Sequence, residues 1–278
     1  MSKPNVGVLG LGIIGSRVVE NLRQSGHEVF VWSRSARAVP NFLASPREVA
    51  QAAGIIQIFV RDSIALLDSV KDMLPALTSS HLVMNHATVS KKATLEASKM
   101  VEDAGAAFLD APFTGSKMAA QNAKLCYYIG GPALLIERAR PVLEASAIKI
   151  MPLGAIGDAM VLKIVTNLVS SVIVEALAEA ASITLANDIP LERLLTALEG
   201  NANYSTLVGM KLPAIMNGNF EPHFSLQNML KDADFARELA QEAKLALPAL
   251  DATAEIMRHG VDAGHGDLDF SIIGKRIL

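Results

Sequence analysis

A glycine pattern, Gly10-Leu11-Gly12-Ile13-Ile14-Gly15, limits the fold of this chain more than any other segment, because it lies between a β-rich run and a helical pattern. In that position each glycine has its own role. Gly10 allows a tight turn, Gly12 allows close approach of the backbone to a pyrophosphate, and Gly15 allows close helix–strand packing. The helix that follows would offer unpaired N–H groups and a positive dipole end to phosphates. Compared with a purely structural glycine turn, dinucleotide binding is favoured, with Gly10, Gly12, Ile13, Ile14 and Gly15 as cofactor contacts.

β-rich runs and helical patterns alternate from Val6 to about residue 152, which is typical of a parallel sheet with crossover helices. Two kinds of signal mark the ends of the helices. At the start of one helix, Ser45 is a predicted N-cap and Pro46 follows it in the first turn. At the ends of helices, three glycines are predicted C-caps: Gly26, Gly54 and Gly105. The predicted strands are Val6–Leu9, Glu28–Trp32, Ile55–Val60, Leu82–Met84, Ala107–Leu109, Leu125–Ile129 and Lys149–Met151.

After Pro152 the strand signal disappears and only helical patterns follow, among them Leu191–Glu199, Leu226–Lys244 and Pro248–Ala263. We therefore expect an α/β Rossmann-type N-terminal domain, residues 1–157, and an all-helical C-terminal domain, residues 158–278. A long helix at about residues 158–187 would connect them. Its apolar segment Ala159–Ala186 carries three charged residues, Lys163, Glu175 and Glu179, each of which costs about 2.5 to 3.5 kcal/mol at a bilayer centre, so a buried helix is favoured over a membrane span.

The run Ser33-Arg34-Ser35 follows the second predicted strand, where an NAD-specific site would place an acidic residue for the ribose 2′-hydroxyl. No acidic residue stands there. Arg34 offers a guanidinium for a 2′-phosphate, and the hydroxyls of Ser33 and Ser35 could donate to the same oxygens. NADP(H) is therefore favoured over NAD, the alternative being a loop arginine without a ligand.

Two further segments could carry chemistry. Thr114, Gly115 and Ser116 follow a predicted strand, and their N–H groups and hydroxyls could form a small anion site for a carboxylate, or simply a turn. Lys163 lies among apolar residues early in the long helix, and its face continues through Asn167. A buried ammonium is costly, so Lys163 either serves chemistry or is a core lysine whose charged end reaches solvent.

Taken together, these motifs resemble the β-hydroxyacid dehydrogenase family, which includes 3-hydroxyisobutyrate dehydrogenase and the glyoxylate/succinic semialdehyde reductases. The resemblance extends over essentially the whole chain, and the run Gly115-Ser116-Lys117 with Ala120 most resembles the semialdehyde reductase branch. The motifs that carry it are Gly10–Gly15, Gly26–Arg34, Asp110–Gly115, Gly154–Gly157 followed by Lys163 and Asn167, Leu230–Asp232, and Gly264–Phe270.

The resemblance implies an NADPH-dependent enzyme that interconverts a small carboxylated aldehyde or ketone, of the glyoxylate or succinic semialdehyde type, with its hydroxy acid. Lys163 would be the acid/base and Asn167 would help to hold the substrate. Thr114, Gly115 and Ser116 would bind the substrate carboxylate. Lys231 would contact substrate and cofactor from the helical domain, and Val60 and Thr88 would also contact the cofactor.

The chain departs from the family pattern at a few positions. Phe113 and Thr114 replace the usual Val and Ser, and Ala87 replaces a serine before Thr88. The bulkier Phe113 would shrink or reshape the pocket. Two alternatives remain open: an imine reductase-like enzyme, against which Lys163 argues, and a non-catalytic NADP-binding interaction module.

Composition limits the partners and the compartment. The net charge is −3, from 25 basic and 28 acidic residues, so a nucleic-acid surface is not expected. One cysteine, Cys126, excludes an internal disulfide and fits a reducing, cytoplasmic location. The histidines, His81, His86 and His223 among them, show no metal-ligand spacing and are expected on the surface or in loops. Apolar stripes on the long helix suggest a homodimer or homotetramer, with a substrate cleft between the domains.

Overall fold

The structure, a computed structural model, describes residues 3–277. The chain divides into two compact units, Met1–Lys163 and Ile164–Leu278, and the boundary lies inside one long helix, α7 (Asp158–Ala186).

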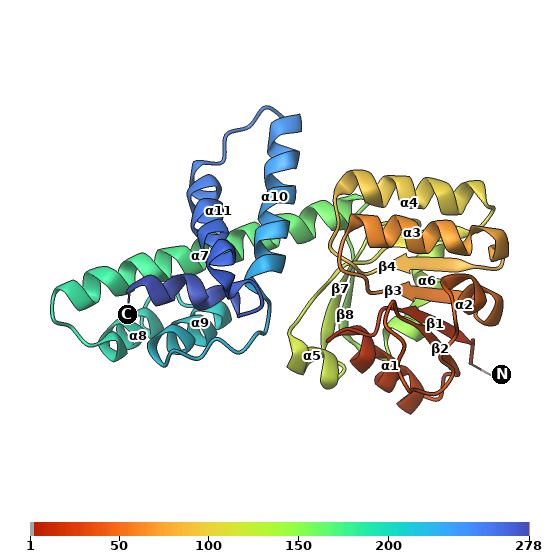
Figure 1. Cartoon of the computed structure of the whole chain (residues 1–278), viewed down its shortest axis with the longest axis horizontal. Helices are drawn as coiled ribbons and strands as arrows, with labels where there is room; N and C mark the ends of the chain where they lie inside the picture. Colours follow the sequence, from red (N-terminus) through yellow and green to blue (C-terminus); the bar gives the residue numbers. More distant parts are fainter. Residues whose placement is uncertain (1–2, 278) are drawn as a thin grey trace. The chain divides into compact units, whose positions relative to one another are not determined.

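The N-terminal unit is built on a five-stranded sheet, sheet A, with the strand order β2-β1-β3-β4-β5 (Figure 1). Every neighbouring pair is parallel, which confirms the predicted parallel sheet. Because β2 and β3 lie on opposite sides of β1, the strand order reverses next to the carboxyl end of β1, where ligands of such sheets bind. The strands are β1 (Val6–Leu9), β2 (Val29–Trp32), β3 (Ile55–Ile58), β4 (Leu82–Asn85) and β5 (Ala107–Asp110).

Helices cover both faces of sheet A. Val18 and Leu22 of α1 pack with Val6 and Val8 on one face, whereas a Cβ atom on Gly7 would meet Val49 of α2 on the other. Helices α2, α3 and α4 contact one another in sequence order, and the crossover helices between parallel strands lie where the alternating pattern predicts. These helices are α1 (Gly15–Gln24), α2 (Pro46–Ala52), α3 (Ser63–Met73) and α4 (Lys91–Asp103).

A second, three-stranded sheet, sheet B, has the order β6-β7-β8. It contains β6 (Phe113–Thr114), β7 (Leu125–Ile129) and β8 (Ala147–Pro152), with α5 (Lys117–Gln121) and α6 (Ala133–Leu143) between them. The sequence predicted the last two strands, but it treated Thr114 as the start of a turn, and that part was wrong. Thr114 pairs antiparallel with Cys126 in β6. A two-residue strand is too short to show the alternation from which strands are predicted.

The predicted helix ends are correct at three of four positions. The Ser45 side chain accepts a hydrogen bond from the Glu48 N–H, and Pro46 follows it in the first turn of α2. Gly26 and Gly105 have φ angles of +82° and +84°, the left-handed conformation of a glycine C-cap. The prediction for Gly54 was wrong, because α2 ends at Ala52 and its C-cap, Ala53, takes an extended conformation that needs no glycine.

Between the two sheets lies an aromatic cluster of four rings, Phe59, His86, Phe113 and Tyr127. The His86 ring stacks on Phe59 at a centroid distance of 4.5 Å, and its Nδ1 donates to the Ala111 carbonyl at 2.7 Å. His86 is buried, as is His81, whose Nε2 lies 2.8 Å from the Ala50 carbonyl. Both histidines lie in loop positions that flank β4, as expected, but both are core residues rather than surface ones, and His86 Nε2 has no hydrogen-bond partner among the described residues.

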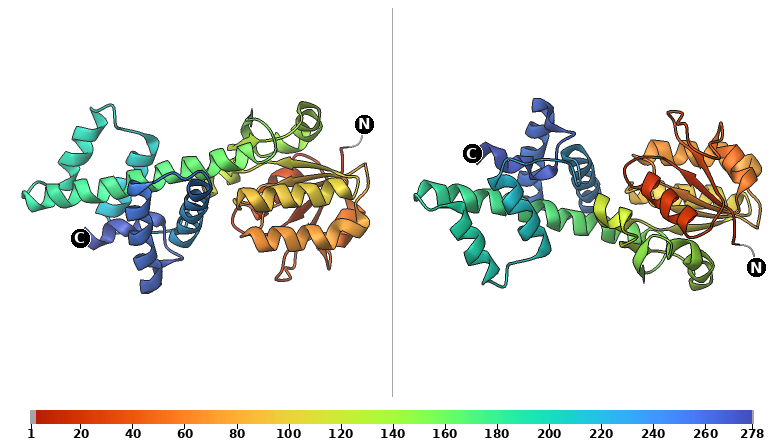
Figure 2. Two further views of the ribbon diagram at one scale, coloured as in Figure 1. Left: turned by 90° about the horizontal axis from the view of Figure 1, so that it is seen from above. Right: turned by 90° about the horizontal axis from the view of Figure 1, so that it is seen from below.

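The C-terminal unit is all helical, as predicted, and Figure 2 shows its helices from two sides. Its core joins Leu177 of α7, Leu191 of α8, and Val208 and Leu212 of α9. The helices are the remainder of α7, α8 (Leu191–Glu199), α9 (Thr206–Met216), α10 (Leu226–Glu242) and α11 (Pro248–Gly260), followed by a π-helical turn, Val261–His265, and a 3-10 helix, Phe270–Ile277.

A buried ion pair ties the last segment of the chain to α9. Lys211 Nζ donates to Asp269 Oδ1 at 2.7 Å, and Asp269 Oδ2 accepts from the N–H groups of His223 and Phe224. Burial alone would raise the pKa of Asp269, but the nearby ammonium of Lys211 holds it below its ordinary value. Removing either partner would leave an unpaired buried charge.

By length and composition alone, α7 could cross a membrane, and 44% of its most apolar 18-residue window is buried inside the protein. This helix also carries the buried polar side chains of Lys163, Asn167 and Glu175. A core helix shows the same combination of apolar length and burial.

The buried His86 is expected to make stability depend on pH. Burial lowers its pKa from 6.5 to about 4, although the hydrogen bond to Ala111 opposes the shift. Between those two values the unfolded chain binds more protons than the folded one, so the free energy of unfolding falls as the pH is lowered through that range. The shift corresponds to on the order of 3 kcal/mol.

The variant His86→Phe keeps a ring in the aromatic cluster but cannot titrate, so it should lose this part of the pH dependence. Denaturant unfolding of wild type and variant across the same pH range measures the difference. His223→Phe, at an exposed position outside the aromatic cluster, is the matched control. Equal pH dependence in wild type and His86→Phe would contradict the assignment.

Candidate functional site

The glycine loop between β1 and α1 is closely packed at two of its three glycines and open at the third. A Cβ atom on Gly10 (φ +100°) would lie 2.1 Å from the Phe59 carbonyl oxygen, and one on Gly15 would lie 2.0 Å from the Gly10 carbonyl oxygen. A Cβ atom on Gly12 would meet nothing within 4 Å. The loop thus brings helix α1 close to β1 while leaving free space beside the backbone at Gly12.

Several backbone N–H groups of this loop have no backbone acceptor among the described residues. Among residues 3–277, none accepts a backbone hydrogen bond from the N–H groups of Gly12, Ile13 or Ile14. The N-cap of α1, Ile14, has no side-chain cap, and Arg17 donates to the Ile13 carbonyl from one turn further on. Unpaired N–H groups at a helix N-terminus, next to open space, fit the pyrophosphate of a dinucleotide.

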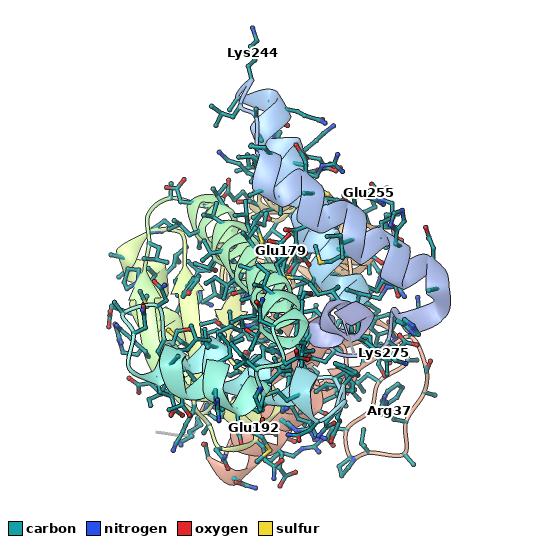
Figure 3. All side chains as sticks on the ribbon, turned by 90° about the vertical axis from the view of Figure 1, so that its left-hand side faces the viewer. Arg37, Glu179, Glu192, Lys244, Glu255 and Lys275 are labelled. Atoms are coloured by element: carbon teal, nitrogen blue, oxygen red, sulfur yellow. The ribbon has the colours of Figure 1, made fainter. Side chains whose placement is uncertain are left out.

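The loop after β2 places Arg34 and Ser35 in exposed positions and Ser33 in a half-buried one. The Ser33 hydroxyl donates to the Ser35 carbonyl at 2.7 Å, so it would have to give up that bond to donate to a phosphate. Arg37, which was not among the predicted site residues, is exposed on the same loop (Figure 3). The segment therefore offers two guanidinium groups and no acidic side chain at the end of β2.

Val60 and Thr88 follow the carboxyl ends of β3 and β4 and are half-buried. Asn85, the last residue of β4, is buried, and its side chain bonds both the N–H and the carbonyl of Ala87, at 3.1 and 3.2 Å. No role was predicted for Asn85, yet this side chain fixes the turn that leads to Thr88. Because parallel strands end at one edge of a sheet, Val60 and Thr88 lie at the same edge as the glycine loop.

The predicted carboxylate-binding segment is a short strand followed by a helix cap. Gly115 has a φ of +131°, and the Ser116 side chain accepts a hydrogen bond from the Ala119 N–H at 3.4 Å as the N-cap of α5. The neighbouring Phe113 packs its ring into the aromatic cluster, with centroids 6.0 Å from Phe59 and 6.3 Å from Tyr127. A strand and a cap hold this segment in one conformation.

Lys163 is buried in the second turn of α7, and the start of that helix is held by Asp110. Asp110 Oδ2 accepts from the N–H groups of Gly157, at 3.1 Å, and Met160, at 2.8 Å. The pKa of Asp110 is raised to about 7. Burial is the main cause and the charge of Asp158 adds to it, whereas the two hydrogen bonds oppose the rise. Asp110 belongs to the Asp110–Gly115 motif, but no local pattern in the sequence indicates that it caps the long helix.

In the C-terminal unit, Asp232 brings two of the predicted site residues together. Asn167 on α7 donates to Asp232 Oδ2 at 2.6 Å, and Lys231 Nζ lies 2.9 Å from Asp232 Oδ1. Asp232 is fully buried. It was named as part of the motif around Lys231 without a role, and the structure shows that it orients both neighbours.

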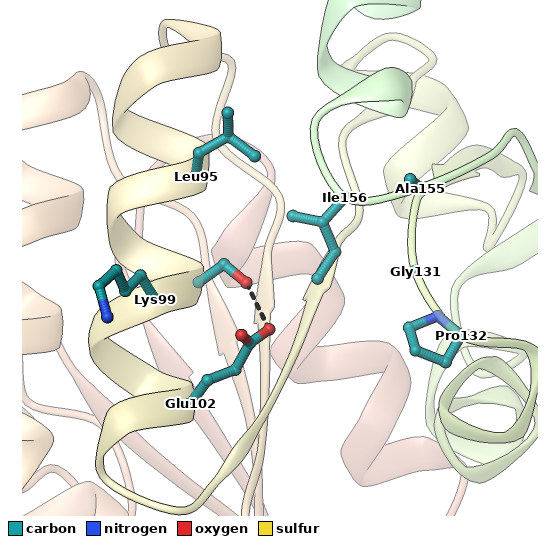
Figure 4. A pocket seen from close by; sticks show the side chains of 8 residues that line it. Leu95, Lys99, Glu102, Gly131, Pro132, Ala155 and Ile156 are labelled. Carbon is teal, nitrogen blue, oxygen red and sulfur yellow. Dashed lines mark hydrogen bonds between the residues drawn. The ribbon is translucent and has the colours of Figure 1, made fainter.

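A hollow of about 590 Å³ lies elsewhere on the N-terminal unit, between α4 and the segments around Pro132 and Ile156 (Figure 4). Ser98 donates to Glu102 at its edge, at 2.8 Å. None of the predicted site residues lines it. In the part of the chain that the structure describes, no group of three or more His, Cys, Asp or Glu side chains could hold a metal ion.

Two family models together match residues 5–277. Residues 5–157 match the NAD binding domain of 6-phosphogluconate dehydrogenase. Residues 157–277 match the NAD-binding domain of NADP-dependent 3-hydroxyisobutyrate dehydrogenase.

Curated relatives include both enzymes and a nuclear factor. The chain is 26% identical to glyoxylate/succinic semialdehyde reductase 1 of Arabidopsis thaliana, over 96% of each chain. It is 27% identical to the cytokine-like nuclear factor N-PAC of Anopheles gambiae, and that match covers 99% of this chain but only half the length of the relative.

Solved structures agree with the fold. The 3-hydroxyisobutyrate dehydrogenase of Mycobacterium tuberculosis, solved with L-serine, is 27% identical over 99% of each chain, with a TM-score of 0.91. An imine reductase of Myxococcus stipitatus, solved with NAD+, is 22% identical over 99% of each chain, with a TM-score of 0.66, and shows a shared fold alone.

Substitutions at Gly12 and Gly15 should separate folding from cofactor binding. Gly12→Ala adds a methyl group in open space, so we expect an unchanged Tm but an affinity for NADPH at least about tenfold weaker, since the methyl takes the space a pyrophosphate would approach. Gly15→Ala is the matched control. Its methyl would clash with the Gly10 carbonyl and should lower the Tm by about 4 °C or more.

Calorimetry and a fluorescence titration with NADPH measure the two effects. Wild-type NADPH affinity in Gly12→Ala would show that the loop backbone does not approach the cofactor.

Proposed function

The chain belongs to the β-hydroxyacid dehydrogenase family, and on that basis we propose that it is an NADPH-dependent reductase of small carboxylated aldehydes or ketones, of the glyoxylate or succinic semialdehyde type. The reaction would also run in reverse, from the hydroxy acid. The observation that carries this proposal is the buried Lys163 near the start of α7, in a chain whose glycine loop fits a dinucleotide.

Each polar group of the proposed site has a physical role. When bound, the reduced nicotinamide supplies a hydride to the carbonyl carbon. Lys163 would donate a proton to the carbonyl oxygen as the general acid. Asn167, one helical turn along α7, would orient the substrate oxygen, while Asp232 fixes its amide.

Recognition of the substrate carboxylate is assigned to Thr114, Gly115 and Ser116, with Lys231 as a further contact from α10. Support comes from the fixed conformation of the first segment, which a strand and a helix cap hold. A preorganised anion site of this kind favours a short carboxylated substrate over a plain aldehyde.

The preference for NADPH over NADH rests on Arg34. Its guanidinium is exposed beside the end of β2, and no acidic side chain stands there to bind a free ribose 2′-hydroxyl. Arg37 on the same loop adds a second positive charge. A doubly charged 2′-phosphate would be attracted to this loop.

We also propose a cytoplasmic homodimer or homotetramer. Exposed apolar side chains recur along α7, at Leu162, Val165, Val169 and Ile183. Apolar residues exposed in such a row are typical of a surface that a protein partner covers.

A second candidate, a non-catalytic NADP-binding module, is favoured by one observation. The chain matches half of a protein that is named as a nuclear factor rather than as an enzyme.

An absorbance assay of NADPH oxidation separates the candidates. We expect consumption with glyoxylate or succinic semialdehyde and little with plain aldehydes, because only the former carry a carboxylate for the Thr114–Ser116 segment. Consumption with cyclic imines alone would favour an imine reductase. No consumption with any carbonyl compound or imine would favour the binding module.

In the same assay NADH should be a poorer cofactor than NADPH. Arg34→Ala should reduce this preference by about tenfold, the effect of losing one charge-assisted contact with the 2′-phosphate. Equal use of the two cofactors by wild type would remove the assignment of Arg34.

Replacement of Lys163 tests the proton donor. Lys163→Ala should lower kcat by about 10² to 10⁴, the usual effect of losing a general acid, while NADPH affinity stays close to wild type. Lys99→Ala, at an exposed lysine of α4, is the control and should leave kcat unchanged. Stopped-flow turnover and an NADPH titration measure both quantities. Near-normal turnover in Lys163→Ala would show that another group donates the proton.

A further inference from the structure

We propose that Asp110 is a positioning residue that fixes the first turns of α7 and so places the Lys163 ammonium without contacting the substrate. This inference rests on the proposed function, because it assigns Asp110 a role through Lys163. Both residues lie in the N-terminal unit, Met1–Lys163.

The hydrogen bonds of Asp110 join segments that are far apart in the sequence. Asp110 ends β5, and one of its oxygens, Oδ2, accepts from two N–H groups, 47 and 50 residues further along the chain. The donors, Gly157 and Met160, lie just before and within the first turn of α7. Such N–H groups have no partner inside the helix, so a single carboxylate oxygen satisfies two of them.

This contact bears directly on Lys163. Met160 and Lys163 are three residues apart, so they lie on neighbouring positions of the same helical face. Asp110 pairs with Asn85 in sheet A, the sheet that also carries the glycine loop. The carboxylate therefore fixes the helix that bears the lysine to the sheet on which a dinucleotide would bind.

The choice of a carboxylate is costly, which argues for a role beyond filling space. Asp110 is fully buried, and its second oxygen, Oδ1, has no hydrogen-bond partner in the described part of the chain. A hydroxyl or amide side chain could cap a helix at a lower desolvation cost. In its ionised form, the carboxylate also attracts the positive end of the helix dipole.

The unpaired Oδ1 suggests a conservative variant. In Asp110→Asn, the amide oxygen can take the place of Oδ2 and accept both hydrogen bonds, while the amide nitrogen takes the place of Oδ1. Asp110→Ala removes both acceptors. Asp110→Val, which is closer to aspartate in volume, serves as the second variant without acceptors in case the alanine protein does not fold.

Two measurements test the proposal in the purified full chain. Without cofactor or substrate, hydrogen exchange at the Gly157 and Met160 amides should be at least about tenfold faster in Asp110→Ala than in wild type, because the bonds to Oδ2 are lost. In turnover, Asp110→Ala should lower kcat by about 10- to 100-fold, the effect of a displaced proton donor. KM for the carbonyl substrate and NADPH affinity should stay within about threefold.

Asp110→Asn should keep both the slow exchange and a kcat within about threefold of wild type. A purely structural cap would speed exchange in Asp110→Ala and leave kcat unchanged, and that result would overturn the proposal. Equal loss of kcat in Asp110→Asn and Asp110→Ala, or a loss confined to KM or NADPH affinity, would also overturn it.

Lys163→Ala, measured in parallel, separates the two levels of inference. If it keeps normal turnover, the proposed function fails. If it loses turnover while Asp110→Ala does not, only the positioning role of Asp110 fails.

Discussion

The contact between Gly15 and the carbonyl of Gly10 determines what the N-terminal unit can bind. Helix α1 can begin directly against the end of β1 only because neither residue has a side chain. Three loop N–H groups are thereby left without backbone acceptors in the described chain, at the edge where the strand order of sheet A reverses. Every other part of the candidate nucleotide site, from the arginine loop after β2 to Thr88 after β4, is arranged around that edge.

Much of this architecture is readable from local patterns. Parallel strands covered on both faces appear as short, nearly continuous apolar runs, and all five strands of sheet A were found in this way. The glycine pattern between a strand and a helix indicated the loop, and Lys163 stood out because charged residues rarely interrupt an apolar helix face. Composition alone would have given none of these assignments.

Other features depend on partners that the sequence does not reveal. His86 is a core residue because the Ala111 carbonyl lies beside it, and Asp232 orients Asn167 across 65 residues of chain. Asp110 looked like one member of a motif until the amides of Gly157 and Met160 were seen beside it. Strand β6 has two residues, too few to show the alternation of side chains from which a strand is predicted. Long-range hydrogen bonds and very short strands therefore mark the limit of inference from sequence for this chain.

Phe113 has two structural roles, one for its backbone and one for its ring. Its backbone directly precedes the Thr114–Ser116 segment proposed to hold a carboxylate, and its ring contacts Phe59 and Tyr127 between the two sheets. A smaller residue at this position would leave a void among those rings before it gave any ligand more room. A change of substrate range through a smaller residue at position 113 would therefore need larger side chains at the neighbouring aromatic positions, which would fill the void.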